Sequence, residues 1–391
     1  MSGTKIICII DGFAIGLAPS TIENNTPAGR LKALQNKKTI KALRQEIDSL
    51  DDEILELLNR RAKLVIEVGK QKSARKDSFH VPSREREIYD RLTAHNKGPF
   101  PNEGLRSVFR EIISASLALE APMKVAFFGP KATFTHLAAM QQFGLSAELV
   151  PQKSIPAVFE DVEKGRALYG VVPVENSTEG MVSHTLDMFM ESELKINAEV
   201  LLEIHHYLLS RTGRFEDIKK VYSHLQPIAQ CRNWLAENLP NVPVVDVAST
   251  AVAAQIVSED YTAAAIASEL AASMYDLKIV RERIEDQVNN FTRFLVIGKK
   301  LADASSADKT SLMFSVKDEV GILYRMLEPF AKRGINLSKI ESRPLKKKAW
   351  VYIFFLDLVG HINDPVIAEA VRELSHCCQF VKVLGSYPRA K

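Results

Sequence analysis

The stretch that follows residue 38 has apolar residues at steps of three and four, which is the spacing of a helix with one apolar face. These residues are Ile40, Leu43, Ile47, Leu50, Ile54, Leu57, Leu64, Val65 and Val68. Thr39 can cap the helix, and no proline interrupts it before Pro82. At about 1.5 Å per residue the helix would run roughly 50 Å, which is too long for one small domain to cover. The pattern therefore predicts that a partner chain covers the apolar stripe.

Two cations lie on the same face as this stripe. Arg61 follows Ile54 by seven residues, and Lys72 follows Arg61 by eleven, about three helical turns. A buried positive charge is costly unless an anion meets it, so the spacing favours a bound anion. The alternative is that both side chains reach the helix edge or pair with a glutamate.

Two shorter helices follow the long one. The first begins at Pro82 and Ser83 in "VPSREREIYDRL", since proline suits the first turn of a helix. After the breaker "NKGPFPN", the second runs through "EGLRSVFREIISASLALE" to Glu120. Three helices with cations among their apolar positions predict a bundle that binds a small polyanion.

Short apolar runs alternate with helical stretches from Met123 to about residue 300, which predicts an α/β domain, in two lobes. The expected strands are "KVAFFG", "AELVP", "LYGVVPV", "KVYSH", "VPVVDVA", "AAAIAS" and "RFLVIG". Ligands gather at the carboxyl ends of strands in such sheets, and free backbone N–H groups at helix starts favour anions. Polar clusters stand at these places in "VPVENSTEG", "GPKATFTHLAA", "SHLQPIAQCRNWL" and "EDQVNNFTRF".

The cluster "ENSTEG" has a simpler interpretation as a helix-capping turn, since Ser177 and Thr178 cap well. The adjacent pair Ser223 and His224 does not make a serine-hydrolase triad, because neighbouring residues cannot form the required chain of hydrogen bonds. No glycine-rich nucleotide motif is present. We therefore expect a site for a small anionic molecule.

The last part of the chain follows a polar linker, residues 301–309. Six segments read strand, helix, strand, strand, helix, strand: "TSLMFSV", "GILYRMLEPFAKRG", "NLSKIESRP", "AWVYIFFLDL", "DPVIAEAVRELSHCC" and "VKVLGSYP". This βαββαβ order is the α+β ferredoxin-like plan.

Composition narrows the possible partners. The 391 residues carry a net charge of +3, so there is no electrostatic reason to expect binding to nucleic acid or a membrane, and the Lys346–Lys348 run is expected to be solvated surface. None of the four cysteines has the paired spacing of a zinc site, which predicts free thiols in a reducing cytoplasm and no metal. Residues 1–38 faintly resemble a secretion signal, but Asp11 interrupts the apolar stretch. We expect a disordered extension or an incorrectly assigned start.

Residues 39–121 resemble the all-helical chorismate mutases, which form intertwined dimers. The resemblance lies in "ALRQEID", "NRRAKLVIEVGKQK", "VPSREREI" and "REIISASLALE". It implies that Lys72 and a protonated Glu120 donate to the ether oxygen of chorismate as the bond breaks. It also implies a role in substrate binding for Arg61, Arg84, Glu85, Ser116 and, from the other subunit, Arg44.

Residues 122–300 resemble the prephenate dehydratases, a two-lobed fold like that of the periplasmic binding proteins. "VPVENSTEGMV" and "NNFTRF" are the most specific motifs. The resemblance implies that the Thr292 hydroxyl shares the charge on the leaving oxygen and that Arg293 holds a substrate carboxylate. It further implies prephenate contacts for Glu175, Asn176, Ser177, Thr178, Ser223 and Gln230.

Residues 310–391 resemble the ACT amino-acid-binding domain, which implies phenylalanine as effector. The implied effector site comprises Gly321, Ile322, Leu323, Asn336, Leu337, Glu341, Ser342, Arg343 and Pro344. The whole chain is thus expected to be a cytoplasmic, cofactor-free enzyme that converts chorismate through prephenate to phenylpyruvate and forms a homodimer or a higher homo-oligomer. The alternatives are an arogenate-preferring dehydratase, a non-catalytic sensor, and a C-terminal domain that only dimerises.

Overall fold

The computed structural model describes residues 38–75, 82–120, 122–305, 307–317, 319–344 and 352–390. The predicted N-terminal extension lies outside these residues except for Lys38, and so does the lysine run at 346–348. The chain forms two compact units, one ending at Arg61 and the other beginning at Ala62. The second unit contains the end of the first helix and everything that follows.

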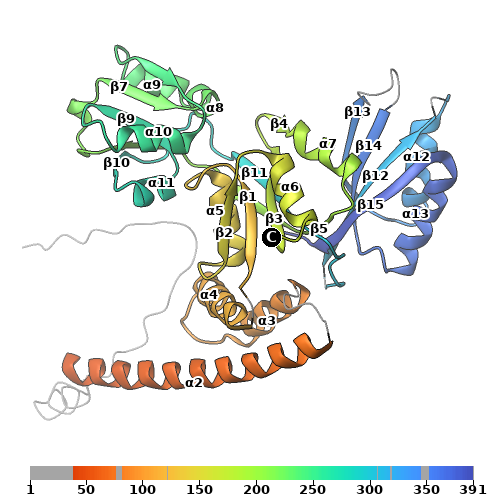
Figure 1. Cartoon of the computed structure of the whole chain (residues 1–391), viewed down its shortest axis with the longest axis horizontal. Coiled ribbons are helices and arrows are strands. Elements are labelled where there is room, and N and C mark those ends of the chain that lie inside the picture. Colours follow the sequence, from red (N-terminus) through yellow and green to blue (C-terminus); the bar gives the residue numbers. More distant parts are fainter. Residues whose placement is uncertain are drawn as a thin grey trace, which may run out of the picture. The chain divides into compact units, whose positions relative to one another are not determined.

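The three predicted helices are present (Figure 1): α2 (Ile40–Arg75), α3 (Pro82–His95) and α4 (Asn102–Glu120). Thr39 caps α2 as expected, because its Oγ1 accepts the Ala42 N–H at 3.2 Å. The apolar stripe of α2 is exposed except at Val65, which is half-buried, and Leu50 for example is 55% exposed. Single exposed leucines are ordinary, whereas a continuous row of them indicates a surface that another chain covers.

The first lobe of the middle domain is built on a six-stranded sheet in the order β2-β1-β3-β11-β5, with β4 paired to β3. Strands β1 to β3 are parallel, whereas β11 is antiparallel to both of its neighbours because it returns from the second lobe. The elements are β1 (Lys124–Phe128), α5 (Phe134–Phe143), β2 (Glu148–Gln152), α6 (Ile155–Glu163), β3 (Tyr169–Asn176), β4 (Gly180–Met181), α7 (Ser183–Glu191), β5 (Lys195–Glu203) and β11 (Phe291–Gly298).

The second lobe has a five-stranded sheet in the order β10-β6-β9-β7-β8. Its central strand β9 is four alanines and one isoleucine, all buried, so that helices can pack closely on it. The elements are β6 (Tyr207–Ser210), η1 (Phe215–Asp217), β7 (Lys220–Ser223), α8 (Leu225–Gln230), α9 (Arg232–Asn238), β8 (Val244–Asp246), α10 (Thr250–Val257), β9 (Ala263–Ala267), α11 (Glu269–Met274) and β10 (Lys278–Arg281).

All seven strands expected in the middle domain are present, but the sequence missed four: β4, β5, β6 and β10. Strands β5 and β6 lie in one apolar stretch, "KINAEVLLEIHHYLLS", which carries no turn residue to mark where one sheet ends and the other begins. The stretch is continuous because the chain passes directly from the first lobe into the second at residues 204–206.

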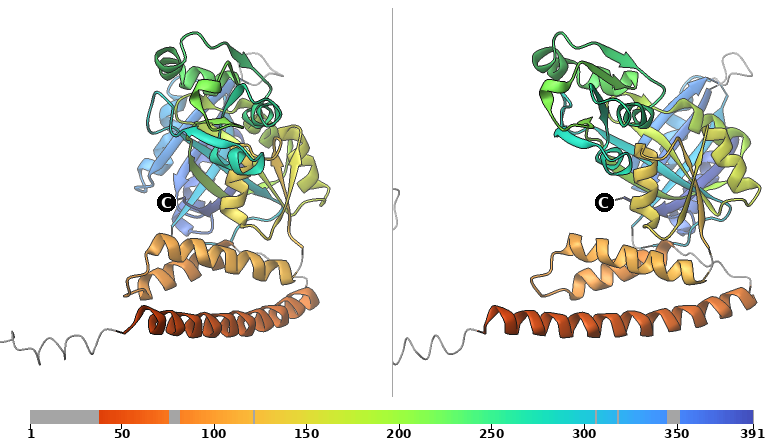
Figure 2. Two further views of the ribbon diagram at one scale, coloured as in Figure 1. Left: turned by 90° about the vertical axis from the view of Figure 1, so that its left-hand side faces the viewer. Right: turned by 60° about the vertical axis from the view of Figure 1, so that its left-hand side comes forward.

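The C-terminal domain has the sheet order β13-β14-β12-β15, which confirms the ferredoxin-like plan. Its β15 lies alongside β5 of the first lobe (Figure 2), where a Cβ at Gly385 would be 2.3 Å from the Ile196 carbonyl oxygen. Only glycine permits this approach of the two backbones. The elements are β12 (Asp308–Val316), α12 (Ile322–Ala331), β13 (Leu337–Pro344), β14 (Tyr352–Val359), α13 (Pro365–Cys377) and β15 (Cys378–Pro388).

Strands β3 and β11 place side chains on both faces of the first sheet. Their register pairs Asn176 with Thr292 and Glu175 with Arg293. Because successive side chains of a strand point to opposite faces, the first pair lies on one face and the second pair on the other. This alternation decides which of the predicted residues reach the site.

Candidate active site

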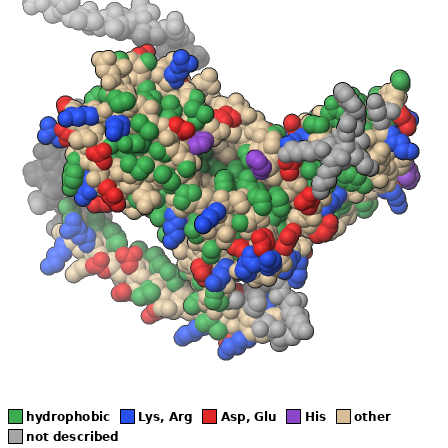
Figure 3. All heavy atoms as spheres, turned by 45° about the horizontal axis from the view of Figure 1, so that its top comes forward, with side chains coloured by type: hydrophobic (Ala, Val, Ile, Leu, Met, Phe, Trp, Pro, Cys, Tyr) green, Lys and Arg blue, Asp and Glu red, His purple; other side chains and the backbone are tan. Residues whose placement is uncertain are grey.

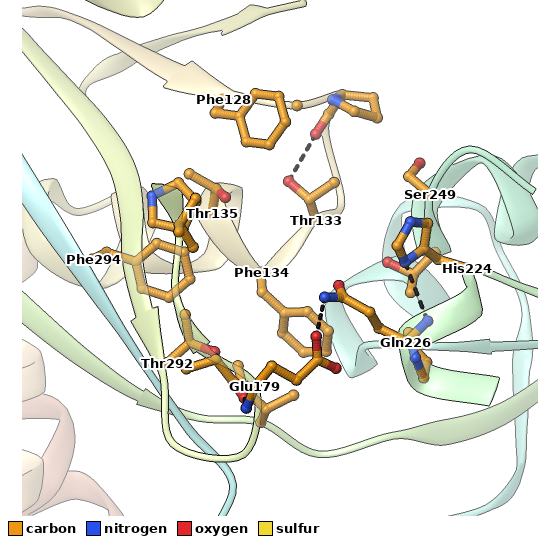
Figure 4. A pocket seen from close by; sticks show the side chains of 18 of the residues that line it. Phe128, Thr133, Phe134, Thr135, Glu179, His224, Gln226, Ser249, Thr292 and Phe294 are labelled. Carbon is orange, nitrogen blue, oxygen red and sulfur yellow. Dashed lines mark hydrogen bonds between the residues drawn. The ribbon is translucent and has the colours of Figure 1, made fainter. Parts of the chain in front are cut away.

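A cavity of about 1010 Å³ lies between the two lobes of the middle domain. A space-filling view shows it as a hollow with hydrophobic side chains inside and histidines near its edges (Figure 3). Thr292 and Phe294 of the first lobe face His224, Gln226 and Ser249 of the second across the opening (Figure 4). The cavity is large enough for a substituted six-membered ring with two carboxylates.

The hydroxyl of Thr292 accepts a hydrogen bond from Asn176 Nδ2 at 2.8 Å. Among the described residues, no other hydrogen bond to this hydroxyl is formed. Both residues line the cavity. Since Thr292 Oγ1 accepts from Asn176, the hydrogen of Thr292 itself is available to a molecule in the cavity.

The amide of Asn176 is held by the turn that follows it. Its Oδ1 accepts the backbone N–H groups of Thr178 and Glu179 at 3.0 and 3.1 Å, and the Thr178 hydroxyl at 2.6 Å. The cluster "ENSTEG" is thus a turn that fixes a cavity side chain. The simpler interpretation as a helix cap is wrong, because the next helix, α7, has Val182 at its N-cap position and no side chain caps it.

The two lobes meet at Glu179. Its carboxylate accepts a hydrogen bond from the side-chain amide of Gln226 (Figure 4) and another from that of Gln230, and both glutamines lie on α8 of the second lobe. Thr178 Oγ1 also lies 3.3 Å from Gln230 Nε2. These contacts connect the lobes at the edge of the cavity.

The charged groups of the cavity are few. Among the described residues that line it, Lys153 is the one lysine or arginine and Glu179 the one acidic residue. The N-termini of α5 and α10 also face the cavity, capped by Thr133 and Ser249. Helix N-termini carry partial positive charge, so together with Lys153 they favour an anion.

Two histidines of the middle domain are buried: His206, which lines the cavity, and His136, which lies in α5 outside the lining. Burial lowers the pKa of His206 below the ordinary histidine value of 6.5. Burial, and to a lesser extent Lys131, also lowers the pKa of His136. Both are therefore neutral at pH 7, and neither supplies a positive charge for a substrate carboxylate.

Arg293 requires a correction of the expectation from the sequence. Its guanidinium lies on the opposite face of the sheet from the cavity and is 11% exposed. It pairs with Glu199 at 2.7 Å and with Asp357 of the C-terminal domain at 2.7 Å, and donates to the Tyr387 hydroxyl at 2.9 Å. A substrate carboxylate in the cavity cannot reach it, because β11 itself lies between them.

Four other predicted contacts of prephenate also lie away from the cavity lining, and one of them is Thr178, whose hydroxyl donates to Asn176. Glu175 pairs with Lys339 of the C-terminal domain at 2.5 Å. Ser223 is fully buried and donates to the Ile266 carbonyl at 2.7 Å. The Ser177 hydroxyl accepts the Phe291 N–H at 2.9 Å and braces the start of β11. These residues support the site instead of lining it.

In the helical domain, the structure brings Lys72 and Glu120 together. Lys72 Nζ lies 3.3 Å from Glu120 Oε2, and the Glu120 side chain is 6% exposed. Gly69 permits this approach, since a Cβ there would lie 3.1 Å from Glu120 Cγ. The two residues predicted to donate to the same ether oxygen are thus neighbours, and Lys72 also pairs with a glutamate, as the alternative interpretation proposed.

The other predicted residues of the helical domain are more dispersed. The Ser116 hydroxyl donates to the Ile112 carbonyl at 2.6 Å. Arg84 is exposed and pairs with Glu87 at 2.7 Å, and Glu85 lines a second cavity of about 330 Å³. Arg44 and Arg61 belong to the first unit.

The predicted effector residues lie at opposite ends of the C-terminal sheet. At one level of this sheet, Leu337 of β13 and Thr310 of β12 both pair with Leu358 of β14. At a second level, Arg343 of β13 and Ser315 of β12 both pair with Ile353 of β14. Six residues of strand separate the two levels, which is about 20 Å. Gly321 lies near the second level, because it follows the end of β12 that carries Ser315. Asn336 lies at the first level, because it directly precedes Leu337. Glu341 and Ser342 lie between the two levels, and Ile322, Leu323 and Pro344 lie on the side of Gly321.

Four residues at the site were missed from the sequence: Lys153, Glu179, His206 and Asn290. Glu179 and Asn290 stand inside the quoted motifs "ENSTEG" and "NNFTRF", so the motifs marked them without assigning a role. Lys153 and His206 come after strands at whose ends the sequence analysis found no polar cluster. Only the meeting of the two lobes brings them to one cavity.

In the described part of the chain, no group of three or more His, Cys, Asp or Glu side chains could hold a metal ion. No helix there is long and apolar enough to cross a membrane. Cys231, Cys377 and Cys378 are free thiols.

Comparison with known proteins agrees with the three-part architecture. Residues 43–121 match the family model of chorismate mutase type II, residues 125–302 that of prephenate dehydratase and residues 310–376 that of the ACT domain. A bifunctional chorismate mutase/prephenate dehydratase of Aquifex aeolicus is 54% identical over 355 residues, covering 90% of this chain and 98% of that protein. One of Pseudomonas aeruginosa is 44% identical, covering 91% and 100%.

A solved structure supports the fold of the last two domains. The prephenate dehydratase of Arthrobacter aurescens, in complex with L-Phe, superimposes with a TM-score of 0.64 at 38% identity, covering 68% of this chain and 90% of that one. Taken with the near full-length relatives, these matches show that the chain belongs to the family of bifunctional chorismate mutase/prephenate dehydratases with a C-terminal ACT domain.

Proposed function

We propose that the cavity between the lobes binds prephenate and that Thr292 is the hydrogen-bond donor to its leaving hydroxyl. The observation that carries this proposal is the bond from Asn176 Nδ2 to Thr292 Oγ1, which leaves the hydrogen of Thr292 directed elsewhere. Thr292 lines a cavity of suitable size. The described residues that line the same cavity include one lysine, Lys153.

The dehydratase reaction breaks two bonds at opposite ends of the ring. The bond to the ring carboxylate breaks and releases carbon dioxide, and its electron pair completes the aromatic ring while the ring hydroxyl leaves as hydroxide, which becomes water on protonation. Negative charge therefore builds on the leaving oxygen. A hydroxyl that donates to this oxygen stabilises the transition state more than the ground state.

Asn176 strengthens Thr292 as a donor. A hydroxyl that accepts a hydrogen bond becomes a better donor itself, because hydrogen bonds in a chain polarise one another. With Arg293 on the other face of the sheet, we assign a substrate carboxylate to Lys153 and to the N-termini of α5 and α10. This arrangement needs neither a metal nor a nucleophile.

For the mutase reaction, we propose Lys72 and Glu120 as the donors to the ether oxygen of chorismate, with Arg61 and the partner's Arg44 holding its carboxylates. The reaction is a rearrangement without proton transfer, so restraint of the substrate and donors at one oxygen are sufficient. The 3.3 Å approach of Lys72 and Glu120 supports this assignment. Glu120 donates only when it is protonated.

We further propose that phenylalanine inhibits the enzyme by binding between the C-terminal domains of two copies. The relative from Arthrobacter aurescens was solved with L-Phe. The predicted effector residues here lie about 20 Å apart within one chain, so one domain cannot surround a small amino acid with all of them. Two domains placed side by side could each supply one end, which also agrees with the exposed apolar stripe of α2.

The test of the dehydratase proposal is the variant Thr292→Val, which keeps the shape of the side chain and removes its donor. With prephenate supplied, phenylpyruvate formation followed by ultraviolet absorbance should fall by about 10² to 10³-fold. With chorismate supplied, prephenate formation should stay within about twofold, which reports on folding. Dehydratase turnover near the wild-type value would refute the role of Thr292.

A further inference from the structure

A chain of hydrogen-bonded side chains continues from Asn176 to the second lobe. Asn176 Nδ2 donates to Asn290 Oδ1 at 2.7 Å as well as to Thr292. Asn290 Nδ2 donates in turn to Gln230 Oε1 at 3.1 Å, and His206 Nε2 lies 2.7 Å from the same oxygen. The chain therefore connects β3, the segment before β11, and α8.

The direction of each bond in this chain is set at its two ends. An ionised carboxylate only accepts hydrogen bonds, so Glu179 requires Gln230 to present Nε2 to it, at 3.1 Å, and to keep Oε1 for Asn290. At the other end, two backbone N–H groups occupy the Oδ1 of Asn176, so its Nδ2 must face Asn290. Asn290 then satisfies both neighbours in one orientation only.

The surroundings hold Asn290 in that orientation. Its side chain lines the cavity, and the residue is 3% exposed, so a rotated amide would lose both partners without gaining water. The Ser177 hydroxyl donates to the Asn289 carbonyl at 3.2 Å and accepts the Phe291 N–H at 2.9 Å, which braces the backbone on both sides. Ile204 N–H donates to the Asn290 carbonyl at 2.7 Å.

His206 closes the chain at the connection between the lobes. The residue is 1% exposed, and its Nε2 must carry a hydrogen because Gln230 Oε1 can only accept. The other ring nitrogen, Nδ1, is buried and has no hydrogen-bond partner in the described part of the chain, as expected of a neutral ring in this tautomer. His206 and Asn290 thus converge on Gln230 and keep its amide from turning.

We propose that Asn290 is a positioning residue for the dehydratase reaction. It accepts the second hydrogen of Asn176 Nδ2, keeps the first hydrogen on Thr292 Oγ1, and thereby directs the hydrogen of Thr292 into the cavity. Asn290 acts through Asn176 and not on the substrate. The inference rests on the proposed function of Thr292 as the donor.

The variants Asn290→Ala and Asn290→Asp test this role by steady-state kinetics with prephenate. Asn290→Ala should lower kcat by about 10- to 100-fold with KM within about threefold, because a misaligned donor slows the reaction without weakening ground-state binding. Asn290→Asp keeps the acceptor for Asn176, so its kcat should recover most of the loss, while the added negative charge raises KM. Equal loss of kcat in both variants would contradict the positioning role.

A double-mutant cycle with Asn176→Ala separates action through Asn176 from an independent effect. The double variant should be no slower than Asn176→Ala alone, since Asn290 has nothing to position once that amide is gone. Additive losses would overturn the proposal. Mutase activity measured in the same samples should match that of the wild type. The control variant Asn241→Ala, at an exposed position, should have the dehydratase activity of the wild type.

The outcome for Thr292 is distinguishable from the outcome for Asn290. If Thr292→Val retains turnover, the proposed donor itself is wrong. If Thr292→Val loses turnover and Asn290→Ala does not, the donor stands and the positioning role of Asn290 is refuted.

Discussion

At the scale of single residues, the charged groups that line the cavity are too few to match a dianionic substrate, and no arginine is among the described ones. Prephenate carries two negative charges, yet the described lining residues include one lysine and one glutamate. Lys153 lies at the exposed end of the second strand, so its attraction for a carboxylate is partly screened by water and salt. We expect it to contribute to binding more than to the chemical step.

This expectation gives a prediction for Lys153→Met. The KM for prephenate should rise by about 10-fold with kcat within about threefold, because the lost attraction is the same in ground state and transition state. In the wild type, KM should increase with salt, and this increase should be weaker in Lys153→Met. Initial rates at low and high ionic strength measure both effects. Lys219→Met, at an exposed position of the second lobe, is the matched control, and an unchanged KM in Lys153→Met would exclude the role.

At the scale of secondary-structure elements, β3 and β11 carry the active site on one face and an ionic contact with the C-terminal domain on the other. Thr292 and Asn176 face the cavity, while Arg293 and Glu175 meet charges from β14 and β13. Removing Arg293 would leave the buried carboxylate of Asp357 without its cation and leave Glu199 paired with Lys309, at a cost of about 3 to 5 kcal/mol. The weaker contact between Glu175 and Lys339 is therefore the better one to alter.

We predict that Lys339→Met weakens inhibition by phenylalanine. The effector domain contacts β3 through this ion pair, so the concentration of phenylalanine for half inhibition should rise several-fold, while uninhibited turnover stays within about twofold. Dehydratase rates across a phenylalanine titration measure it. Lys382→Met removes another lysine of the same interface, which pairs with Glu193 away from these strands. Equal effects of the two variants would show that β3 is not the route.

At the scale of the whole molecule, the long helix α2 underlies our proposal that two chains together form the complete enzyme. Most of its large apolar residues from Ile40 to Val68 are exposed, and the proposed mutase site takes Arg44 from a partner. Exposed apolar surface of this extent is normally covered by another chain. A closed dimer would cover both copies of the stripe and form two mutase sites.

Complementation between two inactive chains tests this arrangement. Arg44→Ala and Lys72→Ala should each lose most mutase activity as homodimers. A heterodimer of the two, purified through different tags, has one site with both residues intact and should recover about half of the wild-type mutase rate. Dehydratase activity should be unaffected throughout. A heterodimer as inactive as its parents would mean that each site lies within one chain.

The sequence alone determined the elements and the position of the site along the chain. Periodicities of 3.6 and 2 predicted the three helices, most of the strands and the ferredoxin-like order, because local backbone geometry imposes those periods. The polar clusters at strand ends marked Asn176, Gln230 and Thr292, which the structure brings to one cavity. The strands β5 and β6 were missed because nothing local marks the passage between lobes.

Only the tertiary structure decided which face of each strand meets the cavity. Thr292 and Arg293 are neighbours in one motif, and both were expected at the substrate, but alternation along β11 sends one to the cavity and the other to the C-terminal domain. Both faces of this strand are buried, so no hydrophobic pattern reveals the difference. The roles of Lys153, Asn290 and His206 likewise depend on two lobes that meet through segments far apart in the chain.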